Sequence, residues 1–203
     1  MFGRYSYNQT LRKMTIAFGQ IFNNIQIKRK DSSDNVIQTI KVPLAYAPKE
    51  KFLTRLDGQA SLNDREFAVT LPRMGFEITG LSYDGSRKLT RVQKYRTAKQ
   101  NIDGKVLNFN YTPVPYNINY SLYAFTATAE GGLQIVEQIV PFFQPDYTVT
   151  VNIIPDLDIK RDVPIVLNSI NYEDSYDGSF TTRRAVIYTM NFTAKTYLFG
   201  PDQ

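Results

Sequence analysis

Two acidic groups are the side chains best suited to chemistry in this 203-residue sequence. One group is Asp156, Asp158 and Asp162, and the other is Glu173, Asp174 and Asp177. Carboxylates at such short spacing can gather Ca²⁺ or Mg²⁺ through oxygen ligands, and a pair of them can act as general acid and base on a sugar. Neither group has the spacing of a calcium-binding loop, and both lie beside Pro or Gly, where aspartate commonly bonds to its own turn backbone. We therefore expect turn residues here, with no metal site and no catalytic residue.

Histidine and cysteine are absent from the sequence, which removes groups on which most hydrolases and transition-metal sites depend. Without imidazole or thiol the chain has no Ser-His or Cys-His nucleophile, no usual zinc ligand and no disulfide. A glycine-rich phosphate loop is not indicated either, because Gly131 and Gly132 precede an apolar helix without a lysine. The sequence therefore predicts a protein without a cofactor that is not an enzyme.

Basic residues are concentrated in short stretches, although the net charge is only +5. Residues 1–30 contain no acidic residue and end in Lys28, Arg29 and Lys30. The second stretch, residues 85–102, contains Arg87, Lys88, Arg91, Lys94 and Arg96. Further on, Arg183 and Arg184 follow Glu173 and Asp174, with which they can pair across a turn or across a subunit boundary. These residues are our candidates for a protein interface. The alternatives are solvated surface charge and contact with nucleic acid, for which no recognised binding motif is present.

The first half of the chain shows helix and hairpin patterns. Leu11, Met14 and Phe18 recur at helical spacing and predict a helix over 9–23. Alternating residues on either side of the turn DSSDN predict a β-hairpin ending at residue 42. A short helix is expected over 49–56, and strands over 67–71 and 76–82. Residues 84–104 have no clean period, so we expect an irregular, projecting basic loop.

The second half has clearer signals. Apolar residues alternate with polar ones from Tyr116 to Leu122, which predicts a strand with one buried and one solvent-exposed face. After Gly132 we expect a short helix with apolar residues around most of its circumference. Such a helix should be covered by other parts of the protein. Strands are expected over 147–153, 165–170 and 186–194. Together these elements predict an α+β fold with a mainly antiparallel sheet and helices packed on one face. A single domain over 1–203 is expected, with a helix and hairpin at 9–42, a basic excursion at 84–104 and a core at 105–200.

Several separated blocks, in order, carry a resemblance to a known family. They are MFGRYSYN, FNNIQIKRK, KVPLAYAPKEKF, TLPRMGFEITGLSY, GLQIVEQIVPFFQPDYTVTV, IKRDVPIVLNS and DGSFTTRRAVIYTMNFTAKTYLFGP. The sequence resembles the tail sheath stabiliser and completion proteins of contractile-tailed, T-even-like bacteriophages. Because the blocks are spread through most of the chain, the likeness is more specific than any single motif.

The resemblance implies a structural subunit of a hexameric ring at the head-proximal end of the tail, with a fold of the tail-terminator type. The implied partners are further copies of the chain, the tail sheath protein, the tail tube terminator and the neck or head-completion proteins. DNA passing through the ring is a further implied contact. The implied location is the virion tail and neck, after synthesis in the bacterial cytoplasm. No apolar run is long enough to indicate a membrane partner.

Overall fold

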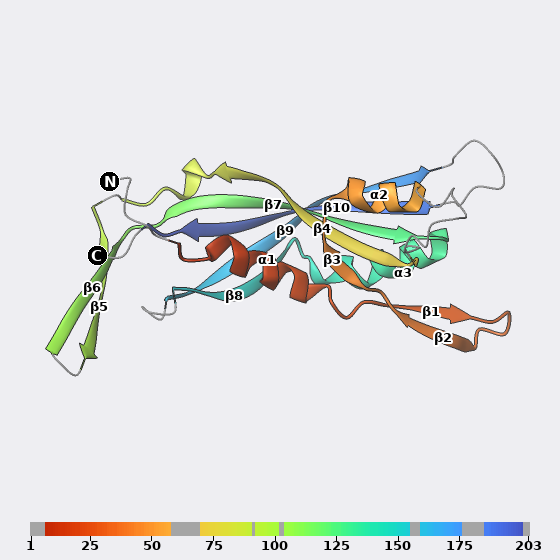
Figure 1. The fold of residues 1–203 in the computed structure, drawn as a ribbon, viewed down its shortest axis with the longest axis horizontal. Coiled ribbons are helices and arrows are strands. Elements are labelled where there is room, and N and C mark those ends of the chain that lie inside the picture. The colour runs from red at the N-terminus through yellow and green to blue at the C-terminus, as the bar shows by residue number, and fades with distance from the viewer. Residues whose placement is uncertain are drawn as a thin grey trace, which may run out of the picture.

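The computed structural model describes most of the chain and shows an elongated molecule (Figure 1). The described residues are 7–57, 70–90, 92–101, 104–154, 159–175 and 185–200. The helices are α1 (Thr10–Ile21), α2 (Lys49–Asp57) and α3 (Ala129–Ile139), with short 3-10 helices η2 (Gly85–Arg87) and η3 (Val140–Phe142). The strands are β1 (Gln26–Lys30), β2 (Val36–Lys41), β3 (Leu44–Tyr46), β4 (Arg73–Tyr83), β5 (Lys94–Asn101), β6 (Gly104–Tyr111), β7 (Val114–Thr126), β8 (Asp146–Ile154), β9 (Ile159–Ser175) and β10 (Ala185–Leu198).

A curled sheet with the strand order β3-β4-β7-β10-β9-β8 forms the centre of the molecule (Figure 1). β3 pairs with β4 in parallel, and the other neighbours in this sheet pair antiparallel. β7 and β10 pair from Val114 opposite Leu198 to Thr126 opposite Val186. The alternation that begins at Tyr116 is confirmed as a central strand. The fold is therefore α+β, built around a mixed sheet.

α1 and α3 cover one face of the sheet, toward which the even-numbered residues of β7 and β10 point. Phe18 of α1 stacks on Tyr120 at 4.3 Å between ring centroids and meets Phe192 edge-on at 5.3 Å. Tyr120 and Phe192 lie opposite each other in the β7–β10 register, so one helical ring covers the seam between two central strands. The helix predicted over 9–23 is confirmed, because Met14 and Phe18 are both buried at a four-residue step.

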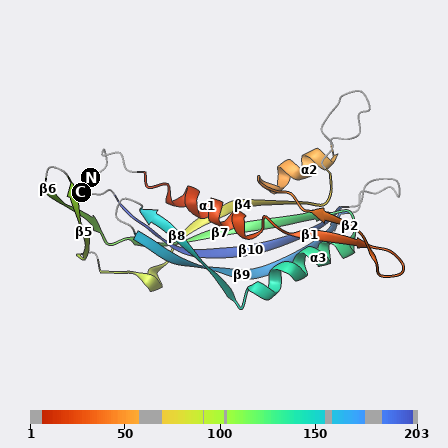
Figure 2. The ribbon, with the colours of Figure 1, turned by 90° about the horizontal axis from the view of Figure 1, so that it is seen from below.

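The expectation that the helices pack on one face of the sheet is wrong for α2, which lies on the opposite side from α3 (Figure 2). Phe52 of α2 packs against Phe125, at 5.2 Å between ring centroids, in a cluster that also contains Tyr123. Gly75 of β4 lies directly beneath Phe52, and a Cβ atom at this position would overlap the ring. The end of β7 is buried on both faces because its odd-numbered residues are also apolar.

Two β-hairpins project from opposite ends of the molecule (Figure 1). The β1–β2 arm pairs Gln26 with Lys41 at its base and confirms the hairpin predicted before residue 42. The β5–β6 arm runs from Lys94 opposite Tyr111 to Asn101 opposite Gly104. Regular strand pairing therefore replaces the irregular loop expected over much of 84–104. Residues 84–104 show no clean period because charged and polar residues outnumber the apolar ones in β5.

α3 is covered on one side only, whereas its sequence suggests that it is covered all round. Its N-terminus is capped by Thr128, whose hydroxyl oxygen accepts the Gly131 N–H at 3.3 Å. At Gly132 the helix approaches β10 so closely that a Cβ atom would overlap the Tyr188 ring. On the outer side Leu133 remains 49% exposed. Gly132 thus serves helix-to-sheet packing and Gly131 donates to the N-cap, while the exposed side of α3 carries Leu133 between Glu130 and Glu137.

Candidate interaction surfaces

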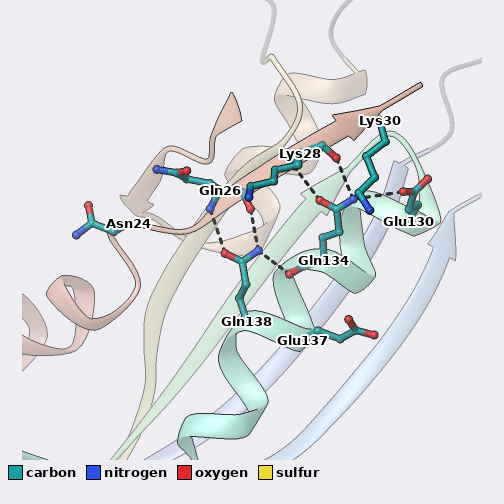
Figure 3. Close-up of a pocket in the computed structure, with 8 residues that line it drawn as sticks. All are labelled: Asn24, Gln26, Lys28, Lys30, Glu130, Gln134, Glu137 and Gln138. Atoms are coloured by element: carbon teal, nitrogen blue, oxygen red, sulfur yellow. Dashed lines mark hydrogen bonds between the residues drawn. The ribbon is translucent and has the colours of Figure 1, made fainter. Parts of the chain in front are cut away.

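Two glutamine side chains of α3 hold the inner strand of the β1–β2 arm (Figure 3). Gln134 accepts the N–H of Lys28 at 2.9 Å and donates to the Lys28 carbonyl at 3.1 Å. Gln138 accepts the N–H of Gln26 at 3.4 Å and donates to the Gln26 carbonyl at 2.7 Å. Four hydrogen bonds thus join the free edge of β1 to one helix. We call this arrangement the glutamine clamp.

The glutamine clamp works because the spacings of a strand and a helix match. Residues two apart in a strand lie about 6.6 Å apart and direct their N–H and C=O groups to the same side. Residues four apart in a helix lie about 6 Å apart along the axis on the same face. Each side-chain amide carries one donor group and one acceptor, as a backbone peptide does. α3 therefore satisfies the edge of β1 as a third strand would.

Charged residues surround the clamp. Lys28 and Lys30 on the arm and Glu130 and Glu137 on α3 line an open polar groove of about 880 Å³ between the two elements. The Lys30 ammonium lies 2.8 Å from Asp34, and the hydrogen bond to this carboxylate raises the pKa of Lys30. All three basic residues predicted on this arm, Lys28, Arg29 and Lys30, are exposed.

Arg87 is engaged within the molecule, at the base of the segment that leads to the β5–β6 arm. Its guanidinium donates to Asp84 at 2.7 Å and to the side-chain oxygen of Asn117 at 2.7 Å. It also lies over the ring of Tyr197, 5.1 Å from the centroid. Hydrogen bonds from Ser86 and then Arg87 lower the pKa of Asp84 below its ordinary value of 3.8. This network links η2 to β7 and β10.

Lowering the pH below the ordinary aspartate range is expected to weaken this network. Because the folded state lowers the pKa of Asp84, its stabilising effect is complete above the unfolded value of 3.8 and is lost as the pH falls through the folded value. The Tm of the wild type should exceed that of Asp84→Asn near neutral pH, and the difference should shrink steadily as the pH falls below about 4. Thermal melts across this range measure the difference. A gap that stayed constant over the whole range would contradict the assignment.

The remaining basic candidates are spread along the chain. Lys88 is exposed after η2, and the Lys94 ammonium lies over the Tyr111 ring at 5.1 Å. Arg96 is in β5, opposite Phe109. Arg91, Arg183 and Arg184 lie outside the described residues. The described basic candidates therefore lie on the β1–β2 arm, around η2 and on the β5–β6 arm, and they do not form one patch.

The acidic candidates are used in pairwise contacts. Glu173 forms an ion pair with Lys49 of α2 at 2.6 Å, and Asp174 accepts a hydrogen bond from Tyr172 at 3.2 Å. Asp162 accepts a hydrogen bond from Thr150, and the other acids of the two sequence groups, at 156, 158 and 177, lie outside the described residues. Within the described ranges no cluster of acidic residues is suited to holding a metal ion. No helix in the part of the chain that the structure describes is long and apolar enough to cross a membrane.

An apolar groove lies where α3 ends and η3 leads into β8. Its volume is about 470 Å³, and its lining includes Ile21, Ile25, Ile139, Phe142 and Tyr147. Phe142 at its mouth is 67% exposed. Glu137 is the one charged residue among the described residues that line it. We call this feature the α3 groove.

Comparison with known proteins identifies the kind of molecule that carries these arms and grooves. The family described as T4-like virus Myoviridae tail sheath stabiliser matches residues 5–203. The chain belongs to this family. The tail completion protein gp15 of Enterobacteria phage T4 is 33% identical to this chain over 207 residues, which cover 99% of this chain and 74% of that protein. The chain is thus a structural protein of a phage tail, and its location in the tail follows from the same relationship.

Sequence reasoning missed two features of this protein. The glutamine clamp joins residues more than 100 positions apart. A glutamine on the surface of a helix is normally interpreted as a side chain that contacts only solvent. The α3 groove had a signal, because Val140 and Phe142 extend the apolar pattern beyond what one packed face needs. An excess of apolar residues around a short helix is therefore an indication of an outward-facing surface.

Proposed function

We propose that this protein forms a hexameric ring at the head-proximal end of a contractile phage tail. There it holds the sheath in its extended form, completes the tail and joins it to the neck. Its contacts are with further copies of itself, the sheath protein, the tail tube terminator and the neck or head-completion proteins, with DNA passing through the ring. A fold of the tail-terminator type is part of the proposal.

The observation that carries the proposal is the presence of two hairpin arms at opposite ends of one sheet. An isolated two-stranded hairpin is marginally stable in water, so an arm that projects beyond its own core is suited to packing against a neighbour. Val36 and Ile37 on the β1–β2 arm are exposed β-branched residues of the kind that contact surfaces bury. Arms at opposite ends allow each copy to contact neighbours on different sides.

Complementation of a phage that lacks its own copy of this gene tests the proposal. Supplying the chain is expected to restore long extended tails joined to heads, with a ring of six copies at the head-proximal end in electron micrographs. Normal joined tails without the chain, or a ring of another size, would contradict it. Purified protein that is retained on DNA in a steeply salt-dependent manner, without joining tails, would favour a nucleic-acid-binding module instead.

Replacing both Lys94 and Arg96 by glutamate is expected to weaken assembly in a salt-dependent manner. Both residues lie in β5, and the change reverses two positive charges on the β5–β6 arm. The defect should be largest at low ionic strength, where charge interactions are least screened. Counting completed tails over a range of salt concentrations measures it. Equal yields at every ionic strength would show that these residues are only solvated charges.

A further inference from the structure

The α3 groove is an apolar surface with an acidic edge. Phe142 and Tyr147 are exposed at the groove, and Glu137 is its charged residue. Asp146, directly before Tyr147, adds a second exposed carboxylate nearby. A surface of this composition fits a segment that offers apolar side chains together with positive charge.

The β5–β6 arm has the opposite charge. Its two strands contain four basic residues and no acidic one, namely Lys94, Arg96, Lys99 and Lys105. They also contain Leu107, Phe109 and Tyr111 at alternate positions, opposite Ala98, Arg96 and Lys94 in the register. Alternate positions of a strand lie on one face, so this arm combines apolar and basic residues in one stretch.

The arm and the groove of one molecule lie apart. The β5–β6 arm leaves one end of the sheet, away from α3, in both views (Figures 1 and 2). One chain thus carries two complementary surfaces that its own fold keeps separate. Complementary surfaces at different places on one molecule form a heterologous interface, which closes into a ring when each copy contributes one of each.

We propose that the β5–β6 arm of one copy docks into the α3 groove of the next copy. The basic residues of the arm lie against Glu137, and its apolar residues cover Phe142. This inference rests on the proposed function, because it takes the neighbour to be a second copy in the ring. DNA is suited to the arm but not to the groove, because an acidic and apolar groove offers no positive charge to bind phosphate.

Charge reversal on the two surfaces provides the first test, in rings assembled on tails that lack the protein. Lys94→Glu/Arg96→Glu and Glu137→Lys, each alone, are expected to lower the number of ring-bearing tails about tenfold or more at low salt, and their combination to restore it. Glu50→Lys is the matched control, because it makes the same charge change on α2, on the other side of the sheet. The arm and α3 lie apart within one chain, so restoration requires contact between chains.

Thiol crosslinking provides the second test, which is clean because the chain contains no cysteine. Tyr111→Cys and Phe142→Cys both replace exposed residues, so neither change removes a core side chain. In assembled rings a short bismaleimide is expected to join chains carrying both changes into a ladder from dimer upward. Chains with Tyr111→Cys and Ile37→Cys, whose second thiol lies on the β1–β2 arm, should give no ladder.

The outcomes separate this inference from the proposed function. Restoration by the combined charge reversal, together with the ladder, supports docking of the arm into the groove. If rings form but the combined charge reversal does not restore the number of ring-bearing tails, or no crosslinked ladder appears, the docking is wrong and the proposed ring still stands. Crosslinks from position 111 to another tail protein would assign the arm to that protein and overturn the docking. If the arm variant Lys94→Glu/Arg96→Glu lost retention on DNA while its rings formed unchanged, the arm would be assigned to DNA, and the docking would again be wrong. Tails that join normally without the chain contradict the proposed function itself.

Discussion

Replacing Phe18 by alanine is expected to destabilise the protein by about 3–5 kcal/mol, the usual cost of removing a buried phenylalanine. The ring is fully buried and contacts Tyr120 on β7 and Phe192 on β10, so alanine leaves a cavity over the seam between the two central strands. In a chain of this size such a loss corresponds to a Tm lower by roughly 6–20 °C. Calorimetry or thermal melts followed by circular dichroism measure the change.

Ile16→Ala is the matched control for this prediction. Ile16 lies on the same helix but is 52% exposed, so its removal should change stability by about 0.5 kcal/mol or less. If the two variants melted at the same temperature, α1 would not be an integral part of the core. The β5–β6 arm, which lies far from Phe18, should keep its exchange behaviour in the Phe18 variant up to the onset of unfolding.

Removing both glutamines of the clamp, by Gln134→Ala/Gln138→Ala, is expected to release the inner edge of the β1–β2 arm. Four hydrogen bonds are lost. At about 0.5 kcal/mol for each of these exposed bonds the sum is about 2 kcal/mol. The amide protons of Gln26 and Lys28 should then exchange roughly thirtyfold faster, whereas those of β7 and β10 should not change. Hydrogen exchange followed by NMR resolves these positions.

Two further variants define the cause of this effect. Glu137→Ala changes the same face of α3 without touching the clamp, so exchange at Gln26 and Lys28 should stay as in the wild type. The double change to glutamate, at 134 and 138, keeps acceptors but loses the amide donors, so we expect an intermediate increase. Unchanged exchange in the double alanine variant would mean that the arm is held in place by other contacts.

Elements whose pattern is repeated and local could be predicted from the sequence. The step from Met14 to Phe18 gave α1, and the alternation that begins at Tyr116 gave β7. The position of α2 was harder to foresee, although one signal existed. From Tyr120 to Phe125 the sequence is apolar at both parities apart from Ser121, which indicates a strand covered on both faces.

The remaining features depend on contacts between distant segments, which a single sequence does not reveal. In the β5–β6 arm only β6 alternates, with Leu107, Phe109 and Tyr111 separated by asparagines, whereas β5 has polar and charged residues at both parities and no period-two signal. Arg87 looked like part of a basic surface, yet Asp84 and Asn117 fix it in place. Of the candidate interface residues, Lys94 and Arg96 on the β5–β6 arm remain the basis of the proposals.

The glutamine clamp should hold the β1–β2 arm equally well when a phage particle moves between solutions of different salt concentration. Its bonds join uncharged amides, so dissolved ions do not weaken them as they weaken contacts between opposite charges. The direction in which the β1–β2 arm leaves the body should therefore be the same in dilute water and in brine. A tail protein built in this way keeps the orientation of one arm constant, while its contacts between opposite charges become stronger or weaker with the salt concentration.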